Sequence, residues 1–251
     1  MIRDNSDVSW EKWGKKNPYY AVLTDDRFRN ENLTNELKAE FFASGPVHME
    51  RILATAVGHF GEMAFRKSAL DFGCGVGRLA IPLARTFDHV TGVDISPAMI
   101  GIAQQRCLEC GIENVDFVLS DDELTRVKGK FDFIHSFIVL QHIPTRRGEQ
   151  IIEQLLKRLS TEGILAIHFP LMRKASIVRK SINSLRRNFA PLSILVNIVQ
   201  RRPWNEPFMQ TNNYDVNHIL ILLSEHGIKN VFLDVIDAGG FLSVYALAKK
   251  P

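Results

Sequence analysis

The sequence has few cysteines and no long apolar run. Three of its 251 residues are cysteines, too few for the disulfide framework of a small secreted domain. Cys107 and Cys110 form a lone Cys-x-x-Cys pair, and without a second pair we predict no zinc or other metal site. No apolar stretch approaches the roughly 18 residues of a membrane-spanning helix. The N-terminus lacks the positive-then-apolar pattern of a secretion signal, so we expect a cytoplasmic protein.

Acidic residues are missing from one long segment. Between Leu171 and Trp204 the charged residues are all basic, namely Arg173, Lys174, Arg179, Lys180, Arg186, Arg187, Arg201 and Arg202. The chain has 31 basic and 28 acidic residues. Without these eight basic residues, 23 basic residues remain against 28 acidic ones, so the rest of the chain is net acidic. Because a structureless loop of this length is improbable, we expect residues 171–213 to form a helical cap insertion, or to be partly disordered.

Apolar runs alternate with helical patterns elsewhere. Strands are predicted at residues 69–72, 89–93, 115–119, 131–137 and 163–169, and helices at 33–42, 47–60, 77–86, 97–110, 122–127 and 147–159. This alternation favours a parallel sheet with helices on both faces. After the insertion, a helix at 214–226 precedes strands at 230–236 and 241–248, whose short connection makes them antiparallel neighbours. The predicted fold class is α/β, with a doubly wound seven-stranded sheet that is mostly parallel and has one antiparallel strand at the end.

The first residues of the chain are polar but rich in aromatic side chains. Residues 1–28 contain Trp10, Trp13, Tyr19, Tyr20 and Phe28. This density is unusual for a disordered tail, so we expect an ordered arm. The aromatic residues either anchor the arm on the domain or form a lid, since mobile lids commonly close such sites. We divide the chain into an N-terminal arm and helix at residues 1–46 and one domain at residues 47–251, which includes the basic insertion.

The most informative motif extends from Ala69 to Arg78, with the sequence Ala-Leu-Asp-Phe-Gly-Cys-Gly-Val-Gly-Arg. A strand, a glycine turn and a helix start predict a nucleotide-like ligand, because glycine allows close approach to the backbone and a helix N-terminus offers free N–H groups. Gly77 comes one position too early for the G-x-G-x-x-G dinucleotide fingerprint. Asp94 follows the second strand, where a carboxylate can accept hydrogen bonds from both hydroxyls of a ribose.

The glycine loop, Asp94, the acids after the third strand and the terminal strand pair together resemble the class I S-adenosylmethionine-dependent methyltransferases of the small-molecule type. The resemblance implies a Rossmann-like fold and S-adenosylmethionine as the cofactor. It places Ile95 on the adenine face and favours Asp121 for the adenine amino group, although Asp121 or Asp122 could instead cap the following helix. The predicted cofactor-binding residues are Asp71, Gly73, Cys74, Gly75, Gly77, Asp94, Ile95, Asp121, Asp122 and Ser136.

Histidine is the predicted catalytic residue type. Methyl transfer needs an aligned nucleophile, and a hydroxyl nucleophile also needs a base, a role that histidine suits near neutral pH. The resemblance places His142 near the transfer site, although a structural role for it is an equal alternative. His168, at the end of the fifth strand, is the second candidate, and His135 is expected in the core. No Asn/Asp-Pro-Pro-Tyr run follows the fourth strand, which disfavours amino methylation of nucleic-acid bases.

The basic insertion bears on the acceptor and on partners. Its charge favours an anionic acceptor, small or carrier-linked, with O- and N-methylation both open. Nucleic acid is not favoured, because no RNA-binding module is recognisable. The apolar stretch after Ala190 could contact a membrane surface, but we prefer a solvated cap with a buried face. The alternative functions are a non-catalytic S-adenosylmethionine-binding partner or sensor and, less favoured, a nicotinamide-dependent oxidoreductase. The oligomeric state is not predicted.

Overall fold

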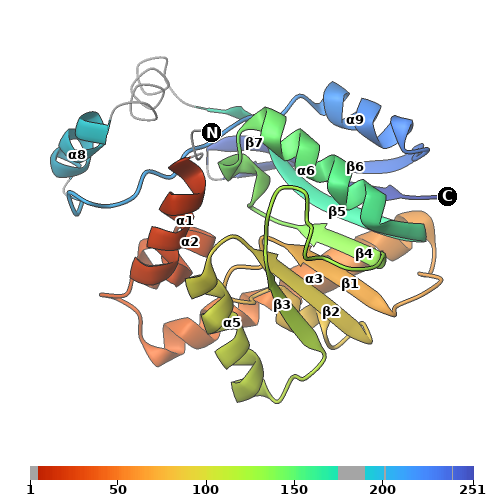
Figure 1. Ribbon diagram of the computed structural model, residues 1–251, viewed down its shortest axis with the longest axis horizontal. Helices are drawn as coiled ribbons and strands as arrows, with labels where there is room; N and C mark the ends of the chain where they lie inside the picture. The colour runs from red at the N-terminus through yellow and green to blue at the C-terminus, as the bar shows by residue number, and fades with distance from the viewer. Residues whose placement is uncertain (1–4, 175–189, 201, 239) are drawn as a thin grey trace.

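The structure is a computed structural model that describes residues 5–174, 190–200, 202–238 and 240–251. Its centre is a seven-stranded sheet with the order β3-β2-β1-β4-β5-β7-β6 (Figure 1). The strands are β1 (Ser68–Phe72), β2 (His89–Asp94), β3 (Val115–Leu119), β4 (Phe131–Ser136), β5 (Leu159–Arg173), β6 (Asn230–Ala238) and β7 (Phe241–Lys249). Neighbours among β1 to β5 pair in parallel, and β7 runs antiparallel to both β5 and β6. The predicted fold class and the terminal antiparallel pair are confirmed.

Successive residues of the central strands pack into two different apolar layers. Ile134 of β4 belongs to a layer shared with α6 (Thr145–Arg158) and α9 (Val216–Glu225). Its neighbour Phe133 belongs to a layer shared with α3 (Asn35–Phe60) and α4 (Ala80–Leu83). Helices therefore bury both faces of the sheet, which explains why these strands are apolar runs without polar alternation.

A single helix, α3, occupies the region directly before β1 where two helices were predicted. α3 continues through Gly45 and Pro46, although proline removes one helical N–H donor. Phe41 in the first half of α3 and Met49 in the second half are both buried. The predicted break at Gly45-Pro46 is wrong, because tertiary burial on both sides of Pro46 outweighs the loss of one hydrogen bond.

The connection after β3 also differs from its prediction. Residues 122–127, expected to be a short helix, form turns. Leu124 has a positive φ of 53° and is almost completely buried, so its side chain anchors the turn in the core. By contrast, α5 (Pro97–Cys110) has the predicted bounds. The Ser96 hydroxyl caps its N-terminus and Gly111 ends it in the left-handed conformation.

The described part of the N-terminal arm is helical. It consists of α1 (Asn5–Lys16), α2 (Pro18–Leu23) and the 3-10 turn η1 (Asp26–Phe28). α1 packs against α5. The buried aromatic residues of the arm, which share a cluster with Phe41 of α3 and Met99 of α5, are Trp13, Tyr19, Tyr20 and Phe28. The proposed boundary at residue 46 lies inside α3, so the division into arm and domain stays an interpretation.

The basic insertion is described only in part, since residues 175–189 and 201 lie outside the described ranges. Its first residues extend β5 to Arg173, and α8 (Ala190–Val199) follows in the second half. Among the described helices, none combines the length and hydropathy needed to cross a bilayer. In the same part of the chain, no group of three or more His, Cys, Asp or Glu side chains is placed to hold a metal ion.

Candidate functional site

The glycine loop after β1 takes a path that only glycine fits well. Gly73 has a φ of 75°, and a Cβ added to it would lie 2.3 Å from a methyl group of Val139. Gly75 has a φ of 53°. The Gly73 N–H donates to the Val93 carbonyl at 2.7 Å, which ties the loop to the end of β2. Bare backbone is therefore presented at the carboxyl ends of β1 and β2, where open parallel sheets bind ligands.

Asp94, the last residue of β2, is held by the loop that faces it. One carboxylate oxygen accepts the Gly75 N–H at 2.8 Å, and the other accepts the Ser96 N–H at 2.9 Å. Burial nevertheless raises the pKa of Asp94 to about 6, even though these N–H groups favour the charged form. Each oxygen keeps a lone pair for a further donor, so the carboxylate is positioned to bind two hydroxyl groups.

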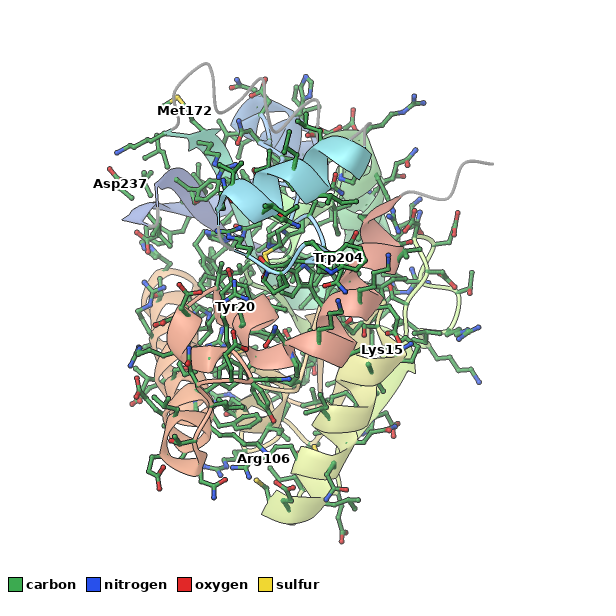
Figure 2. All side chains as sticks on the ribbon, turned by 90° about the vertical axis from the view of Figure 1, so that its left-hand side faces the viewer. Lys15, Tyr20, Arg106, Met172, Trp204 and Asp237 are labelled. Carbon is green, nitrogen blue, oxygen red and sulfur yellow. The ribbon has the colours of Figure 1, made fainter. Side chains whose placement is uncertain are left out.

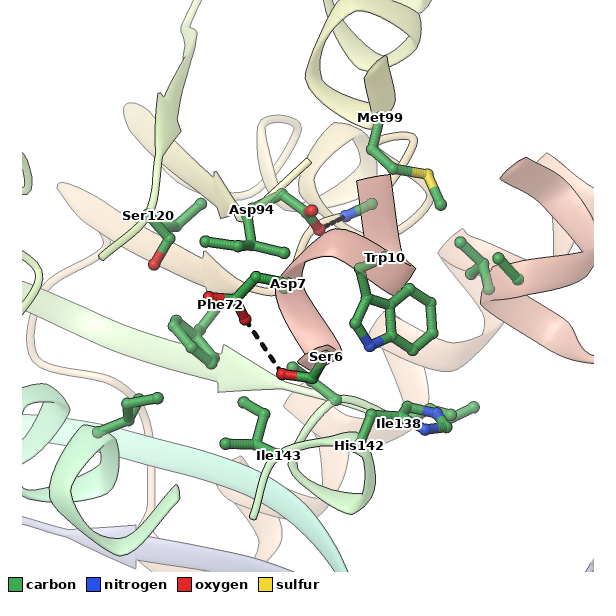
Figure 3. A pocket seen from close by; sticks show the side chains of 18 of the residues that line it. Ser6, Asp7, Trp10, Phe72, Asp94, Met99, Ser120, Ile138, His142 and Ile143 are labelled. Carbon is green, nitrogen blue, oxygen red and sulfur yellow. Dashed lines mark hydrogen bonds between the residues drawn. The ribbon is translucent and has the colours of Figure 1, made fainter. Parts of the chain in front are cut away.

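A pocket opens beside this loop (Figure 3). Of the predicted site residues, it brings together Gly73, Gly75, Asp94, Ile95, Asp122 and His142. The remaining lining residues come from α1, α2, α5, α6, the strand ends and the segment after β4, namely Ser6, Asp7, Trp10, Ala21, Val22, Phe72, Val93, Met99, Ser120, Phe137, Ile138, Val139, Ile143, Arg147 and Ile151.

Five predicted cofactor residues do not line this pocket, namely Asp121, described below, and four residues beneath the loop. Gly77 packs against α5, and a Cβ there would lie 3.2 Å from the Cβ of Ala103. Cys74 is buried below the loop. Asp71 is buried with one oxygen 2.8 Å from His135 Nδ1, and Ser136 is fully buried in β4. These positions support the loop from beneath, so a direct contact with a ligand stays a prediction for each of them.

The two acids after β3 have different surroundings. Asp121, the residue favoured for the adenine contact, accepts hydrogen bonds from the backbone N–H and the hydroxyl of Thr125. Asp122 and Ser120 line the pocket, whereas Asp121 does not. The Asp121 carboxylate therefore caps the local turn, while Asp122 has the pocket position, and an adenine contact by either acid stays a prediction.

Arg147 of α6 links the two sides of the pocket. Its guanidinium donates to Asp122 Oδ2 at 2.7 Å and to both oxygens of Asp7 at 2.8 and 3.0 Å. Asp7 lies in α1, so the arginine joins the N-terminal helix to the loop after β3. No local sequence pattern predicts this link, because Asp7 and Asp122 lie 140 and 25 residues away from Arg147 along the chain.

α1 forms one wall of the pocket. Ser6, Asp7 and Trp10 reach from this helix toward the strand ends, and Trp10 lies beside His142 (Figure 3). The two rings meet edge to face, with 4.8 Å between their centroids. The many aromatic residues in the first 28 positions predicted an ordered arm. They did not show which aromatic side chain faces the pocket.

His142 ends the 3-10 turn η2 (Leu140–His142). Its Nδ1 lies 2.9 Å from the Gln210 carbonyl oxygen, which can only accept, so the proton is assigned to Nδ1. The remaining nitrogen, Nε2, then accepts the side-chain amide of Gln141 at 2.9 Å. Burial lowers the pKa of His142 to about 4, so the ring is neutral at pH 7.

His168 does not face the pocket. Its ring packs on Phe137, a lining residue, with a centroid separation of 5.0 Å, and on Tyr245. Burial lowers the pKa of His168 to about 4, and its Nδ1 has no hydrogen-bond partner among the described residues. The geometry disfavours His168 as a second base, because the Phe137 ring stands at the pocket and His168 behind it. His135 is completely buried, in agreement with its predicted core position.

Known proteins with similar sequences are methyltransferases. Residues 69–163 match the family described as "Methyltransferase domain". The magnesium-protoporphyrin O-methyltransferase of Synechocystis sp. is 39% identical over 96 residues, which are 38% of this chain and 42% of that protein. A ubiquinone biosynthesis O-methyltransferase of Escherichia coli is 31% identical over 137 residues, 48% of this chain and 56% of that protein. The chain thus spans about half the length of these curated relatives.

Solved structures share the fold over longer stretches. One is the magnesium protoporphyrin IX methyltransferase from Synechocystis, crystallised with S-adenosylmethionine. The two structures align over 100% of both chains, with a TM-score of 0.64 and 19% sequence identity. A phosphoethanolamine N-methyltransferase of Haemonchus contortus, crystallised with S-adenosylhomocysteine, has a TM-score of 0.57 and 15% identity, covering 80% of this chain and 52% of that one. At such identities the likeness establishes the fold alone.

Proposed function

We propose that this chain is an S-adenosylmethionine-dependent enzyme that methylates a small acceptor, in line with the methyltransferase domain matched by residues 69–163 and with the shared fold. The observation that carries the proposal is the convergence of Gly73, Gly75, Asp94 and Asp122 on one pocket at the carboxyl ends of the parallel strands. Sequence similarity alone does not show that these residues lie close together in space.

The residues present fit this cofactor. The Asp94 oxygens have lone pairs for two ribose hydroxyls in addition to the backbone N–H groups that they already accept. Gly73 and Gly75 expose backbone to close approach. When bound, S-adenosylmethionine supplies an electrophilic methyl group on a sulfonium. The protein's part is then to bind, orient and exclude water.

Charge in the pocket wall supports the same assignment. The ionisable carboxylates that line it are Asp7, Asp94 and Asp122, against the one guanidinium of Arg147 among the described lining residues. Arg147 is already bonded to two of these carboxylates. A pocket with a negative balance favours a positively charged sulfonium.

For the acceptor, the lining favours an apolar molecule. Phe72, Phe137, Ile138, Val139 and Ile143 supply apolar surface. The expectation of an anionic acceptor rests on the basic insertion, of which residues 175–189 lie outside the described residues. We therefore propose a small, largely apolar acceptor, either free or linked to a carrier. Since the curated relatives named above are O-methyltransferases, a hydroxyl group is the first acceptor atom to test.

His142 is our candidate for the base. With its proton on Nδ1 and donated to Gln210, Nε2 keeps the lone pair that can take a proton from an acceptor hydroxyl. Gln141 occupies this lone pair in the structure, so its amide has to rotate away when an acceptor binds. The Trp10 ring, packed on the imidazole, helps to fix its orientation.

Calorimetric titration tests the cofactor assignment. We expect saturable binding of S-adenosylhomocysteine to the purified chain and no binding of nicotinamide dinucleotides. The reverse result would establish the rival oxidoreductase class and end our proposal. A screen with radiolabelled S-adenosylmethionine against hydroxylated aromatic, isoprenoid and carrier-linked acceptors then separates an enzyme from a non-catalytic binder, because a binder transfers no label to any acceptor.

A further inference from the structure

α8 carries an apolar face that is open to solvent. Ile194, Leu195, Ile198 and Val199 are 39%, 58%, 57% and 75% exposed. Their spacing places them on one side of the helix. α8 contains no charged residue, so these side chains make a continuous apolar strip, which we call the α8 face.

Polar contacts hold α8 on the molecule from its other side. Asn197 is buried, and its amide donates to the backbone carbonyls of Trp204 and Glu206 at 3.3 and 2.9 Å. Glu206 is in turn paired with Arg29 at 2.8 Å. The preferred interpretation of this stretch as a cap with a buried apolar face does not hold for α8, because the anchor is a buried amide and the apolar residues point outward.

Trp204 extends the α8 face. Its side chain is 61% exposed, and Figure 2 shows it next to α8 on the same side of the molecule, with Lys15 beyond it. Indole rings prefer the boundary between water and lipid, since one part of the ring is apolar and the N–H is polar.

Basic residues flank the α8 face. Arg202 comes three residues after the end of α8, and its half-exposed side chain also pairs with Glu206 at 3.7 Å. The ammonium group of Lys16 in α1 reaches the Asn205 carbonyl at 3.4 Å, so the basic end of α1 lies against the same segment. In the sequence, the whole stretch between Leu171 and Trp204 has basic residues and no acid. An apolar helix face with basic flanks is the pattern of helices that lie in an anionic membrane interface.

We propose that the α8 face and Trp204 form a docking surface for an anionic lipid bilayer. A second copy of the chain suits this surface less well, because a two-fold contact would bring the basic flanks of both copies together. Docking would also bring lipid close to the pocket, since the chain runs from α8 to Gln210, which bonds to His142 in the pocket wall. The proposal goes beyond methyl transfer and does not depend on it.

Vesicle co-sedimentation of the full chain tests the proposal. The probes are phosphatidylcholine vesicles with and without about 30 mol% phosphatidylglycerol. We expect binding to the anionic vesicles alone, and weaker binding when salt rises to about 0.5 M. The double variant L195E/I198E should lose about tenfold or more in the vesicle partition coefficient, because two apolar side chains leave the lipid boundary.

The matched control is the double variant L108E/I221E. Leu108 in α5 and Ile221 in α9 are 76% and 53% exposed on other helices, so this variant should bind vesicles as the unchanged chain does. Both variants should keep the circular dichroism spectrum and the melting temperature of the unchanged chain, which report an intact fold. Failure of the unchanged chain to bind anionic vesicles would overturn the proposal, and so would normal binding by L195E/I198E. Light scattering that shows a dimer dispersed by L195E/I198E, without vesicle binding, would assign the α8 face to a second copy instead.

Discussion

At the level of single residues, Asp94 combines two functions at the end of β2. It fixes the glycine loop through the Gly75 N–H and presents its remaining lone pairs to the pocket. Its pKa of about 6 means that the carboxyl group becomes protonated as the pH falls below 6. A protonated carboxyl is a poorer acceptor for two hydroxyl groups, so ligand binding and ionisation of Asp94 are linked.

The first prediction follows from this linkage. Affinity for S-adenosylhomocysteine should fall by about tenfold between pH 7 and pH 5, because binding prefers the charged carboxylate and loses affinity below the pKa of the free protein. The measurement is calorimetry at several pH values in that range, where the amino group of the ligand stays protonated. Asp94→Asn should lose about 1–3 kcal/mol of binding at pH 7 and show little dependence on pH. A flat profile for the unchanged protein would contradict the role of Asp94.

The second prediction concerns His142. His142→Ala should lower the transfer rate to a hydroxyl acceptor at saturating cofactor by about 10²–10⁴-fold, the usual contribution of a general base. Affinity for S-adenosylhomocysteine should stay within a small factor of the original value, since no cofactor contact is assigned to this ring. His218→Ala, which changes an exposed histidine of α9, is the control. A normal rate in His142→Ala would leave His142 a structural role beside Trp10.

At the level of helices and strands, α1 is attached to the pocket wall by an ion pair between Asp7 and Arg147, which are 140 residues apart in the sequence. Arg147 is held between Asp7 and Asp122, and the Asp7 side chain is 39% exposed, which weakens the pair by solvent screening. This ion pair therefore contributes only a small part of the free energy that attaches α1 to the pocket wall. This arrangement agrees with the hypothesis of a lid, which the aromatic residues of the arm alone left undecided.

The third prediction tests this attachment. Asp7→Asn should weaken binding of S-adenosylhomocysteine by about two- to fivefold, the range for a partly exposed ion pair. Trypsin should also cut faster at the lysines of α1, which are Lys12, Lys15 and Lys16. Asp26→Asn removes an exposed acid that pairs with the buried Arg29 and does not line the pocket, and it should change neither quantity. Equal digestion rates for Asp7→Asn and the unchanged chain would argue against the attachment.

The fourth prediction concerns the packing of α3 on the helix start after the glycine loop. A Cβ on Gly45 would lie 2.1 Å from the Arg78 carbonyl oxygen, which is backbone and cannot rotate away. Gly45→Ala should therefore lower the free energy of unfolding by about 1–3 kcal/mol. Gly58→Ala lies in the same helix with nothing within 4 Å of the added Cβ. It should raise the free energy by up to about 1 kcal/mol. Urea denaturation of both variants measures these changes. An unchanged free energy of unfolding in Gly45→Ala would contradict the close contact.

At the level of the whole molecule, the pocket joins α1, the ends of the sheet and α6, so a ligand there contacts segments far apart in the sequence. Our fifth prediction is that S-adenosylhomocysteine at about 100 times its dissociation constant adds about 2.7 kcal/mol to the free energy of unfolding. For a domain of this size, that corresponds to a rise of about 5–10 °C in melting temperature. Scanning calorimetry measures it, and NADH at the same concentration should give no shift.

Local patterns in the sequence are enough to predict the sheet. Apolar runs bounded by glycine and polar residues predicted where each strand lies, because buried parallel strands need apolar residues on both faces. β5, however, extends from Leu159 to Arg173, beyond the predicted residues 163–169. The loop from Gly73 to Gly77 and the acid at Asp94 could be predicted as well, since a positive φ and a strand end leave clear residue preferences. The Ser96 cap and the Gly111 stop gave α5 its observed ends for the same reason.

Short-range rules were sufficient to predict, from sequence, the succession of strands and helices, the glycine turn and the acids that follow two strands. Which of these residues share a pocket depends on the folded arrangement of the whole chain. That arrangement placed Asp122 rather than Asp121 on the wall, moved His168 behind Phe137, and brought Arg147 to Asp7. The fold also allows α3 to continue through Pro46 and exposes the apolar side chains of the α8 face to solvent. The physical reason is that packing and ion pairing between distant segments depend on how the whole chain is arranged, and local sequence does not encode that arrangement.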